Sequence, residues 1–370
     1  MAGNSDLNKA KGAKNDEFYT QYSDIEKEMN SYVEYNPDVF KNKTILLPCD
    51  DPEWSNFTKY FAQNFERFGL KKLISTSFAQ DSKNIDVPMQ LSLFETESPK
   101  FDSEKTNSHG KIFTLTRDTN NSGRIDIDDL EWEYLEGDGD FRSDEVKALR
   151  DEADVIITNP PFSLFREFLA WTMEKNKKFL MISSIGAITY KEVFPLLKNN
   201  IMWLGTGMGR WISGFIVPDK YELYGTEAYI NQDGQRIVAT NNCLWFTNLD
   251  HGKRHEFLQL MSMRDNLKYN KKLLNKLNKN DWSAEYQKYD NYDAIDIPFT
   301  EAIPSDYDGI MGVPVSFLDK YNPEQFVILG ASEQCGKGFS NGLWDSTSKK
   351  AHPMIQGKKQ FSRIFIKKVK

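Results

Sequence analysis

The chain has 370 residues, with 47 Lys and Arg against 54 Asp and Glu, and a formal net charge of −7. This length fits one large α/β unit with a smaller appended region. The three cysteines and four histidines are scattered without ligand spacing, which argues against a zinc site or a disulfide framework. The sequence shows neither a signal peptide nor an apolar run of about 20 residues. We therefore expect a soluble, cytoplasmic protein without a metal ion.

Charge is unevenly distributed along the chain. Residues 81–154 hold 20 acidic and 9 basic residues, whereas residues 341–370 hold eight basic residues and one acidic residue, Asp345. A basic segment can contact the phosphates of a nucleic acid, or it can be a solvated tail. The phosphate-facing part of the protein is therefore expected at the C-terminal end, with the tail as the alternative.

Hydrophobic periodicity predicts an alternation of strands and helices after a polar, Lys-rich arm at residues 1–15. In chain order these are a helix at 22–35, a strand at 44–47, a helix at 54–68, a strand from 73, strands at 111–115 and 124–128, a strand at 155–158, a helix at 164–174, a strand at 178–183, a helix at 190–197, and strands at 201–204 and 243–247. Such alternation is typical of a doubly wound α/β sheet, which binds ligands at the carboxyl ends of its strands.

Two regions interrupt this alternation. Residues 80–110 are polar and irregular, which indicates an insertion at the surface. Residues 118–123 (DTNNSG) predict the turn of a hairpin between 111–115 and 124–128. The same residues partly match a calcium-binding loop, but the twelfth position is Asp129 rather than Glu, so the hairpin is the better interpretation.

The chemistry is expected at Asn159, Pro160, Pro161 and Phe162, which directly follow the apolar, β-branched run 155–158. The lone pair of an exocyclic amine on a base is delocalised into the ring, so the amine is a poor nucleophile. The side-chain carbonyl of Asn159 and the backbone carbonyl of Pro160 can accept both amine hydrogens and aim that lone pair at a methyl donor. The prolines stiffen the loop.

The ring of Phe162 offers a surface on which an extrahelical base can stack. The alternative is that the Asn-Pro-Pro sequence is only a turn that ends a strand. The combination of a buried strand, an acceptor side chain, two prolines and an aromatic ring favours the catalytic interpretation.

Several blocks of the chain resemble the EcoRI-type family of adenine-specific DNA methyltransferases, from about residue 16 to the C-terminus. These blocks are residues 16–22 (DEFYTQY), 49–52 (CDDP), 55–57 (SNF), 137–143 (GDGDFRS), 159–165 (NPPFSLF), 213–218 (SGFIVP), 221–228 (YELYGTEA) and 241–245 (NNCLW). The resemblance implies the γ-like motif order, the seven-stranded Rossmann-like sheet of methyltransferases that use S-adenosylmethionine, and an appended target-recognition region.

The resemblance also implies where the cofactor binds. Phe18, Tyr19 and Thr20 would contact the methionine end of S-adenosylmethionine, Ser77 would lie near its ribose, and Asp140 and Phe141 would contact its adenine. Asp50 and Asp51 stand where most such enzymes have a Gly-x-Gly turn, and their carboxylates can bind the ammonium group. Asn159 would lie beside the methyl group. For Asp140, a role as a loop or cap residue is the alternative.

By the same resemblance the substrate is duplex DNA at a short palindrome such as GAATTC or a variant, in a restriction-modification system or as protective methylation. Arg210, Ser213, Asn241 and Asn242 are then candidate DNA contacts, with a structural hydrogen-bonding role as the alternative. We expect a catalytic domain at 16–250 with DNA-facing loops at about 205–242, a target-recognition region at 251–370, a monomer, and a partner endonuclease in the same system. N4-cytosine methylation, a catalytically silent DNA-binding protein and methylation of a protein amide are the competing hypotheses.

Overall fold

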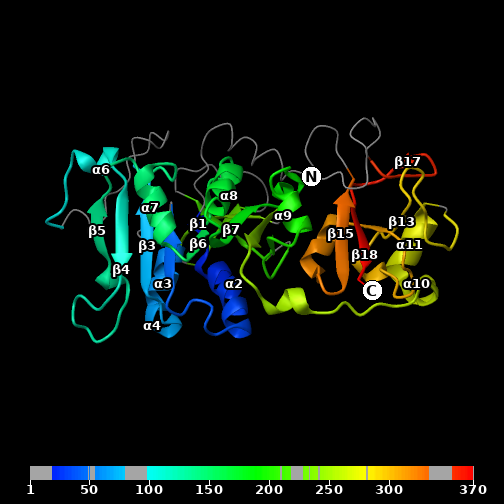
Figure 1. The fold of residues 1–370 in the computed structure, drawn as a ribbon, viewed down its shortest axis with the longest axis horizontal. Helices are drawn as coiled ribbons and strands as arrows, with labels where there is room; N and C mark the ends of the chain where they lie inside the picture. Colours follow the sequence, from blue (N-terminus) through cyan, green and yellow to red (C-terminus); the bar gives the residue numbers. More distant parts are fainter. Residues whose placement is uncertain are drawn as a thin grey trace. The chain divides into compact units, whose positions relative to one another are not determined.

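The structure is a computed structural model that divides into two compact units (Figure 1). The described residues are 19–48, 50, 55–79, 98–208, 211–217, 228–232, 234–240, 242–280, 282–332 and 352–369. Unit 1 comprises Met1–Ser184 and Gly207–Leu249, and unit 2 comprises Ile185–Thr206 and Asp250–Lys370. The chain thus enters unit 2 twice, the second time for its whole C-terminal third.

Unit 1 contains seven strands of an eight-stranded sheet, in the order β5-β4-β3-β2-β6-β7-β12. They are β2 (Thr44–Leu47), β3 (Lys72–Ser77), β4 (Lys111–Leu115), β5 (Glu131–Tyr134), β6 (Val155–Thr158), β7 (Lys178–Ser184) and β12 (Cys243–Thr247). The four strands from β3 to β7 are parallel, whereas β4, β5 and β12 are antiparallel to their neighbours. The predicted α/β class is confirmed, with a sheet that mixes parallel and antiparallel strands rather than a mostly parallel one.

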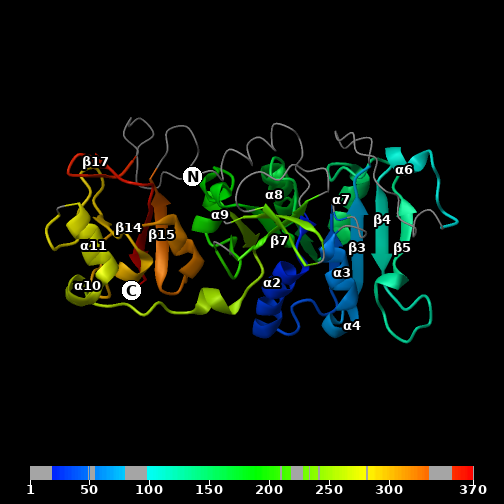
Figure 2. The same cartoon turned by 180° about the vertical axis from the view of Figure 1, so that it is seen from behind.

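The helices of unit 1 are α2 (Tyr22–Tyr35), α3 (Asn56–Gln63), α4 (Phe65–Phe68), α6 (Lys105–Ser108), α7 (Asp144–Glu152) and α8 (Phe165–Met173), seen from both sides in Figures 1 and 2. The predicted helix at 54–68 is interrupted at Asn64, whose backbone leaves the helical region (φ −103°, ψ 12°). Its four phenylalanines, Phe57, Phe61, Phe65 and Phe68, are nevertheless all buried in the core, as the spacing predicts.

The predicted hairpin between 111–115 and 124–128 is wrong. The partner of β4 is β5, and residues 124–128 form no strand. The buried carboxylate of Asp129 accepts hydrogen bonds from the backbone N–H groups of Thr119, Asn120 and Asp126, at 2.7, 3.2 and 3.0 Å. These bonds fold residues 118–129 into a closed loop, and they lower the pKa of the Asp129 carboxyl against the opposing effect of its burial. The strand that pairs with β4 is therefore β5, which lies further along the chain than residues 124–128.

A second, smaller sheet of unit 1 has the order β1-β9-β11-β10, all antiparallel. Its strands are β1 (Tyr19–Thr20), β9 (Gly214–Val217), β10 (Ala228–Ile230) and β11 (Arg236–Ala239). Strand β1 thereby joins the start of the described chain to a segment almost 200 residues later. This pairing positions the N-terminal block that the family resemblance assigned to the cofactor.

Unit 2 is built on a four-stranded sheet with the order β13-β14-β18-β15 and a separate hairpin of β16 and β17. Its strands are β8 (Trp203–Leu204), β13 (Ile295–Asp296), β14 (Met311–Val313), β15 (Phe326–Ala331), β16 (Met354–Ile355), β17 (Lys358–Lys359) and β18 (Ile364–Lys368). Its helices are α9 (Phe194–Lys198), α10 (Met263–Tyr269) and α11 (Lys271–Lys279). The helix predicted at 190–197 and the strand at 201–204 are thus present but shorter.

The C-terminal residues from Arg363 to Lys368 are not a solvated tail. Strand β18 lies between β14 and β15, and Ile364, Phe365 and Ile366 are fully buried. Arg363 is also buried, and its Nε donates to Asp296 at 3.0 Å. This part of the basic segment is therefore a central strand of unit 2.

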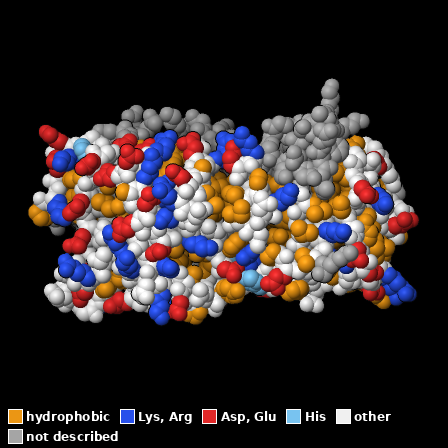
Figure 3. Space-filling view, viewed as in Figure 1, with side chains coloured by type: hydrophobic (Ala, Val, Ile, Leu, Met, Phe, Trp, Pro, Cys, Tyr) orange, Lys and Arg blue, Asp and Glu red, His pale blue; other side chains and the backbone are white. Residues whose placement is uncertain are grey.

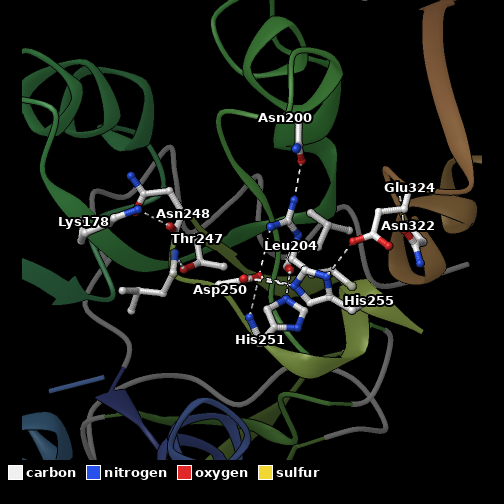
Figure 4. Close-up of polar contacts among 12 residues, drawn as sticks. Lys178, Asn200, Leu204, Thr247, Asn248, Asp250, His251, His255, Asn322 and Glu324 are labelled. Carbon is white, nitrogen blue, oxygen red and sulfur yellow. Dashed lines mark hydrogen bonds and ion pairs between the residues drawn. The ribbon is translucent and has the colours of Figure 1, made fainter. Parts of the chain in front are cut away.

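A polar cluster organises the start of unit 2 after Leu249 (Figure 4). His255 lies between the carboxylates of Asp250 (2.9 Å) and Glu324 (3.5 Å). The buried His251 has its Nε2 3.0 Å from the Leu204 carbonyl, and burial lowers the pKa of this imidazole to about 4. These contacts tie residues 250–255 to β8 and to the turn before β15.

None of the helices in the described part of the chain is long and apolar enough to cross a membrane. Within the same residues, no group of three or more His, Cys, Asp or Glu side chains is arranged to hold a metal ion.

Candidate active site

The order in which strands are added to the sheet switches sides at β2, because β3 lies on one side of β2 and β6 on the other. In open α/β sheets, such a switch at the carboxyl ends of parallel strands is where ligands bind. The buried Thr158, the last residue of β6, donates its Oγ1–H to the Pro48 carbonyl after β2, at 2.7 Å. This bond ties the two strand ends together directly before Asn159.

The segment from Asn159 to Phe162 links β6 to α8 as the sequence predicts. Asn159 and Pro161 are half-buried, Pro160 is buried, and the N–H of Leu164 donates to the Pro161 carbonyl at 2.9 Å, which closes a turn into α8. The Asn159 Oδ1 atom itself is buried. The loop is thus held by a strand on one side and a helix on the other.

Phe162 occupies a different environment from the one expected for an open stacking surface. Its side chain is 8% exposed and belongs to the hydrophobic core, where its ring meets the Phe215 ring edge-on at 6.1 Å. A base can stack on this ring only if neighbouring side chains move. Phe215, in turn, is paired with Thr20 across the β1–β9 ladder.

Asp50 is held at the same edge of the sheet by groups from β3 and α3. Its backbone N–H donates to the Thr76 carbonyl at 2.8 Å, and the Ser75 hydroxyl donates to the Asp50 carbonyl. Its Oδ1 accepts from the hydroxyl of Ser55, the residue that caps α3, at 2.8 Å. Asp50 is only 6% exposed, so its carboxyl group is held in a fixed position beside the end of β2.

The predicted cofactor residues Tyr19 and Thr20 reach the same region through β1. Thr20 is buried, and its carbonyl accepts a hydrogen bond from the Asn56 side chain at the start of α3, at 2.9 Å. The register pairs Tyr19 with Ile216 and Thr20 with Phe215. The N-terminal block, the Asn159–Phe162 segment and the capped end of α3 are therefore linked by direct contacts.

The end of β3 packs closely against the loop that contains Asp140. Ser77 is buried at the end of the strand, and the Ala79 N–H donates to the Asp138 carbonyl at 2.7 Å. Gly139 has a φ of +84°, and a Cβ there would lie 2.3 Å from the Ser77 carbonyl oxygen. Only glycine allows this approach.

The side chains of Asp140 and Phe141 contact different partners. The Asp140 carboxylate binds the Arg142 guanidinium at 2.6 Å and accepts from the Arg142 N–H at 2.8 Å, and these contacts lower the pKa of its carboxyl. The buried Phe141 ring contacts Phe168 and Trp171 on α8. The Asp140 carboxylate is therefore engaged by Arg142, and Phe141 packs the loop on α8.

Ser213 is one of two predicted DNA contacts that the structure describes. Its N–H and hydroxyl both bind the Asp24 carboxylate of α2, at 2.9 Å, and its hydroxyl accepts from Gln21 at 2.6 Å. One turn further along α2, the buried Glu28 accepts from the Trp211 indole at 2.6 Å. Burial raises the pKa of the Asp24 carboxyl, against the opposing effect of Ser213.

These α2 carboxylates were missed in the sequence. Asp24 and Glu28 are four residues apart and so lie on one helix face together with the apolar residues of the core. A buried face that carries two acids requires donors from elsewhere in the fold. The spacing of these two acids on an apolar helix face could have indicated buried carboxylates, although it could not identify Trp211 and Ser213 as their donors.

The remaining predicted residues are less informative. Asn242 is half-buried, and its N–H donates to the Thr240 hydroxyl at 3.2 Å. Burial raises the pKa of the adjacent Cys243 thiol to about 11, so this cysteine stays protonated and serves as packing. Four predicted residues lie outside the described residues: Phe18, Asp51, Arg210 and Asn241.

Comparison with known proteins gives one consistent answer. The family model described as "Adenine-specific methyltransferase EcoRI" matches residues 6–369. The chain belongs to this family. Type II methyltransferase M.EcoRI from Escherichia coli is 45% identical over 328 residues, which cover 89% of each chain. Type II methyltransferase M.MpnI from Mycoplasma pneumoniae is 30% identical over 98% of this chain and 97% of its own.

Type II methyltransferase M.MgeORF184P from Mycoplasma genitalium is 33% identical over 87% of this chain and 85% of its own. No solved structure matches the chain. As a member of the EcoRI family the chain is an enzyme, an adenine-specific methyltransferase. The observed α/β sheet is consistent with that activity.

Proposed function

We propose that the chain transfers the methyl group of S-adenosylmethionine to the N6 amine of an adenine flipped out of duplex DNA. The observation that carries this proposal is the position of Asn159, directly after β6 at the point where the strand order switches from one side of β2 to the other. An acceptor side chain followed by a backbone carbonyl on a proline-stiffened turn suits an amine that must donate two hydrogen bonds to localise its lone pair.

In this mechanism the protein supplies alignment rather than a covalent nucleophile. The Asn159 side-chain carbonyl and the Pro160 carbonyl accept from the adenine amine, and the Thr158–Pro48 bond fixes the backbone that carries them. Pro161 holds the turn into α8. Phe162 and Phe215 form the apolar wall beside this turn, so the flipped base lies against a surface that excludes water.

The residues at the strand ends fit S-adenosylmethionine. The buried Asp50 carboxylate suits a cationic ammonium group, Tyr19 and Thr20 adjoin the Phe162–Phe215 contact, and Ser77 lies where β3 meets the Asp140 loop. When bound, the cofactor supplies a methyl group activated by its sulfonium charge. The seven strands of unit 1 are then assigned to the methyltransferase-type sheet, with the antiparallel β12 beside β7.

The DNA is assigned to both units. Ser213, Asn242, Arg210 and Asn241 belong to the loops of unit 1 that we expect to face DNA, and the region 251–370 supplies target recognition. The relative M.EcoRI supports GAATTC as the first site to test. We further propose that the enzyme works as a monomer. Because its relatives are named type II methyltransferases, we also propose that it protects DNA against a cognate endonuclease.

The assigned role of Asn159 is tested by Asn159→Ala. Loss of one of two acceptors should lower kcat by about 10²–10³-fold and leave the S-adenosylmethionine affinity within a few-fold of wild type. The matched control is Asn275→Ala, which changes an exposed asparagine on α11. Methyl transfer to a GAATTC duplex is followed with labelled cofactor. Turnover of the Asn159 variant within a few-fold of the control contradicts the mechanism.

A further inference from the structure

An exposed aromatic residue stands beside two lysines at the β16–β17 hairpin of unit 2. The Phe361 side chain is 84% exposed, the highest value among the large hydrophobic residues of the described chain. Lys358 and Lys359, which form β17, are both exposed and make no ion pair with any other described residue. The exposed ring gains no free energy from burial in the folded chain. It is therefore available to bind a partner.

The hairpin is held rigidly by a loop of the same unit. Gln356 and Gly357 have φ values of +48° and +72°, the signs that a tight type I′ turn requires. The two oxygens of the Asp290 carboxylate accept the N–H groups of these turn residues at 3.0 and 2.8 Å. The Asn291 side chain donates to the His352 carbonyl and accepts from the Met354 N–H.

The backbone after the hairpin is fixed as well. The Arg363 guanidinium donates to the Phe361 and Ser362 carbonyls at 3.3 and 3.4 Å while its Nε binds the buried Asp296. The Gln360 N–H donates to the Pro353 carbonyl at 2.8 Å. Phe361 is therefore an exposed ring on a backbone anchored on both sides, and its exposure does not come from a loose chain end.

The chemistry of this element matches a nucleic-acid duplex. A two-stranded β-ribbon fits the major groove of B-DNA, lysines contact phosphates, and phenylalanine makes apolar contacts with bases. On the face drawn in Figure 3, basic side chains are mixed with acidic ones and do not gather into one broad patch.

We infer that the β16–β17 hairpin is a DNA-contacting element of unit 2, with Lys358 and Lys359 on backbone phosphates and Phe361 against bases in the groove. This inference rests on the proposed function, because it names the part of unit 2 that binds the DNA substrate. It assigns the basic C-terminal segment a specific contact surface: the hairpin rather than the buried strand β18.

The test uses the full-length chain and fluorescence anisotropy with two short duplexes, one with GAATTC and one with a scrambled sequence. Lys358→Ala/Lys359→Ala should weaken binding to both duplexes and reduce the salt slope by about 2, roughly 0.9 per phosphate contact. The affinity gap to wild type should then shrink about tenfold between about 50 and 200 mM salt. Phe361→Ala should weaken binding about fivefold or more, with an unchanged salt slope.

The matched control is Lys271→Ala/Lys279→Ala, which removes two exposed lysines from α11 in the same unit. Its DNA affinity should stay within about twofold of wild type. If the control loses as much affinity as the hairpin variant, or if neither hairpin variant differs from wild type, the inference is overturned. Wild-type methyl transfer is measured in parallel, and its absence counts against the proposed function instead. Titration with S-adenosylmethionine checks that unit 1 is intact in each variant.

Discussion

Gly139→Ala tests the close approach between β3 and the loop that carries Asp140. The added Cβ would lie 2.3 Å from the Ser77 carbonyl oxygen, about 1 Å short of ordinary contact. A left-handed backbone costs a residue with a Cβ about 1–2 kcal/mol, and overlap in a packed site adds about 1–3 kcal/mol. The free energy of unfolding should therefore fall by about 2–5 kcal/mol.

The same substitution should weaken cofactor binding, because the loop can relieve the overlap only by moving away from Ser77. We expect a loss of at least about tenfold in the affinity for S-adenosylmethionine by calorimetric titration, since a 1 Å displacement of a binding loop is enough for such an effect. Gly137→Ala is the control, because nothing lies within 4 Å of a Cβ there. Urea denaturation should leave this control within about 0.5 kcal/mol of wild type. Equal results for the two variants refute the packing argument.

Two further predictions concern unit 2. The folded state holds His251 neutral with its pKa lowered to about 4, so unfolding takes up a proton as the pH falls from about 6.5 to 4 and stability is lost by up to about 3 kcal/mol. Urea denaturation at pH 7 and at pH 4 should show that the free energy of unfolding falls less for His251→Gln than for wild type. An identical fall in both proteins contradicts the lowered pKa of His251. Asp296→Asn leaves the buried Arg363 without its carboxylate and should cost about 3–5 kcal/mol in unfolding free energy. A cost below 1 kcal/mol would show that the pair is not buried as described.

The sequence predicted the parts of the fold that depend on local pattern. The β-branched run before Asn159 predicted a buried strand, and the structure places β6 there between β2 and β7. The phenylalanine spacing from Phe57 to Phe68 predicted a buried helix face, which is confirmed although the helix breaks at Asn64. Local periodicity carries this information because each residue faces the core or solvent according to its own element.

Features that depend on distant partners could not be predicted in the same way. The turn residues at 118–123 suggested a hairpin, but Asp129 captures their N–H groups and the pairing passes to β5. Arg363 looked like part of a basic tail, yet it is paired with an aspartate 67 positions earlier. Phe162 was expected to offer an open ring, and the β1–β9 ladder brings Phe215 against it.

The most direct test of the central claim is nucleoside mass spectrometry of DNA from cells that express the chain. Cells with the wild-type chain should contain N6-methyladenine that cells with Asn159→Ala lack, and sequencing should place it in one short duplex site. N4-methylcytosine in its place, or DNA without any methylated amine, would contradict the account of Asn159 as an acceptor for the adenine amine.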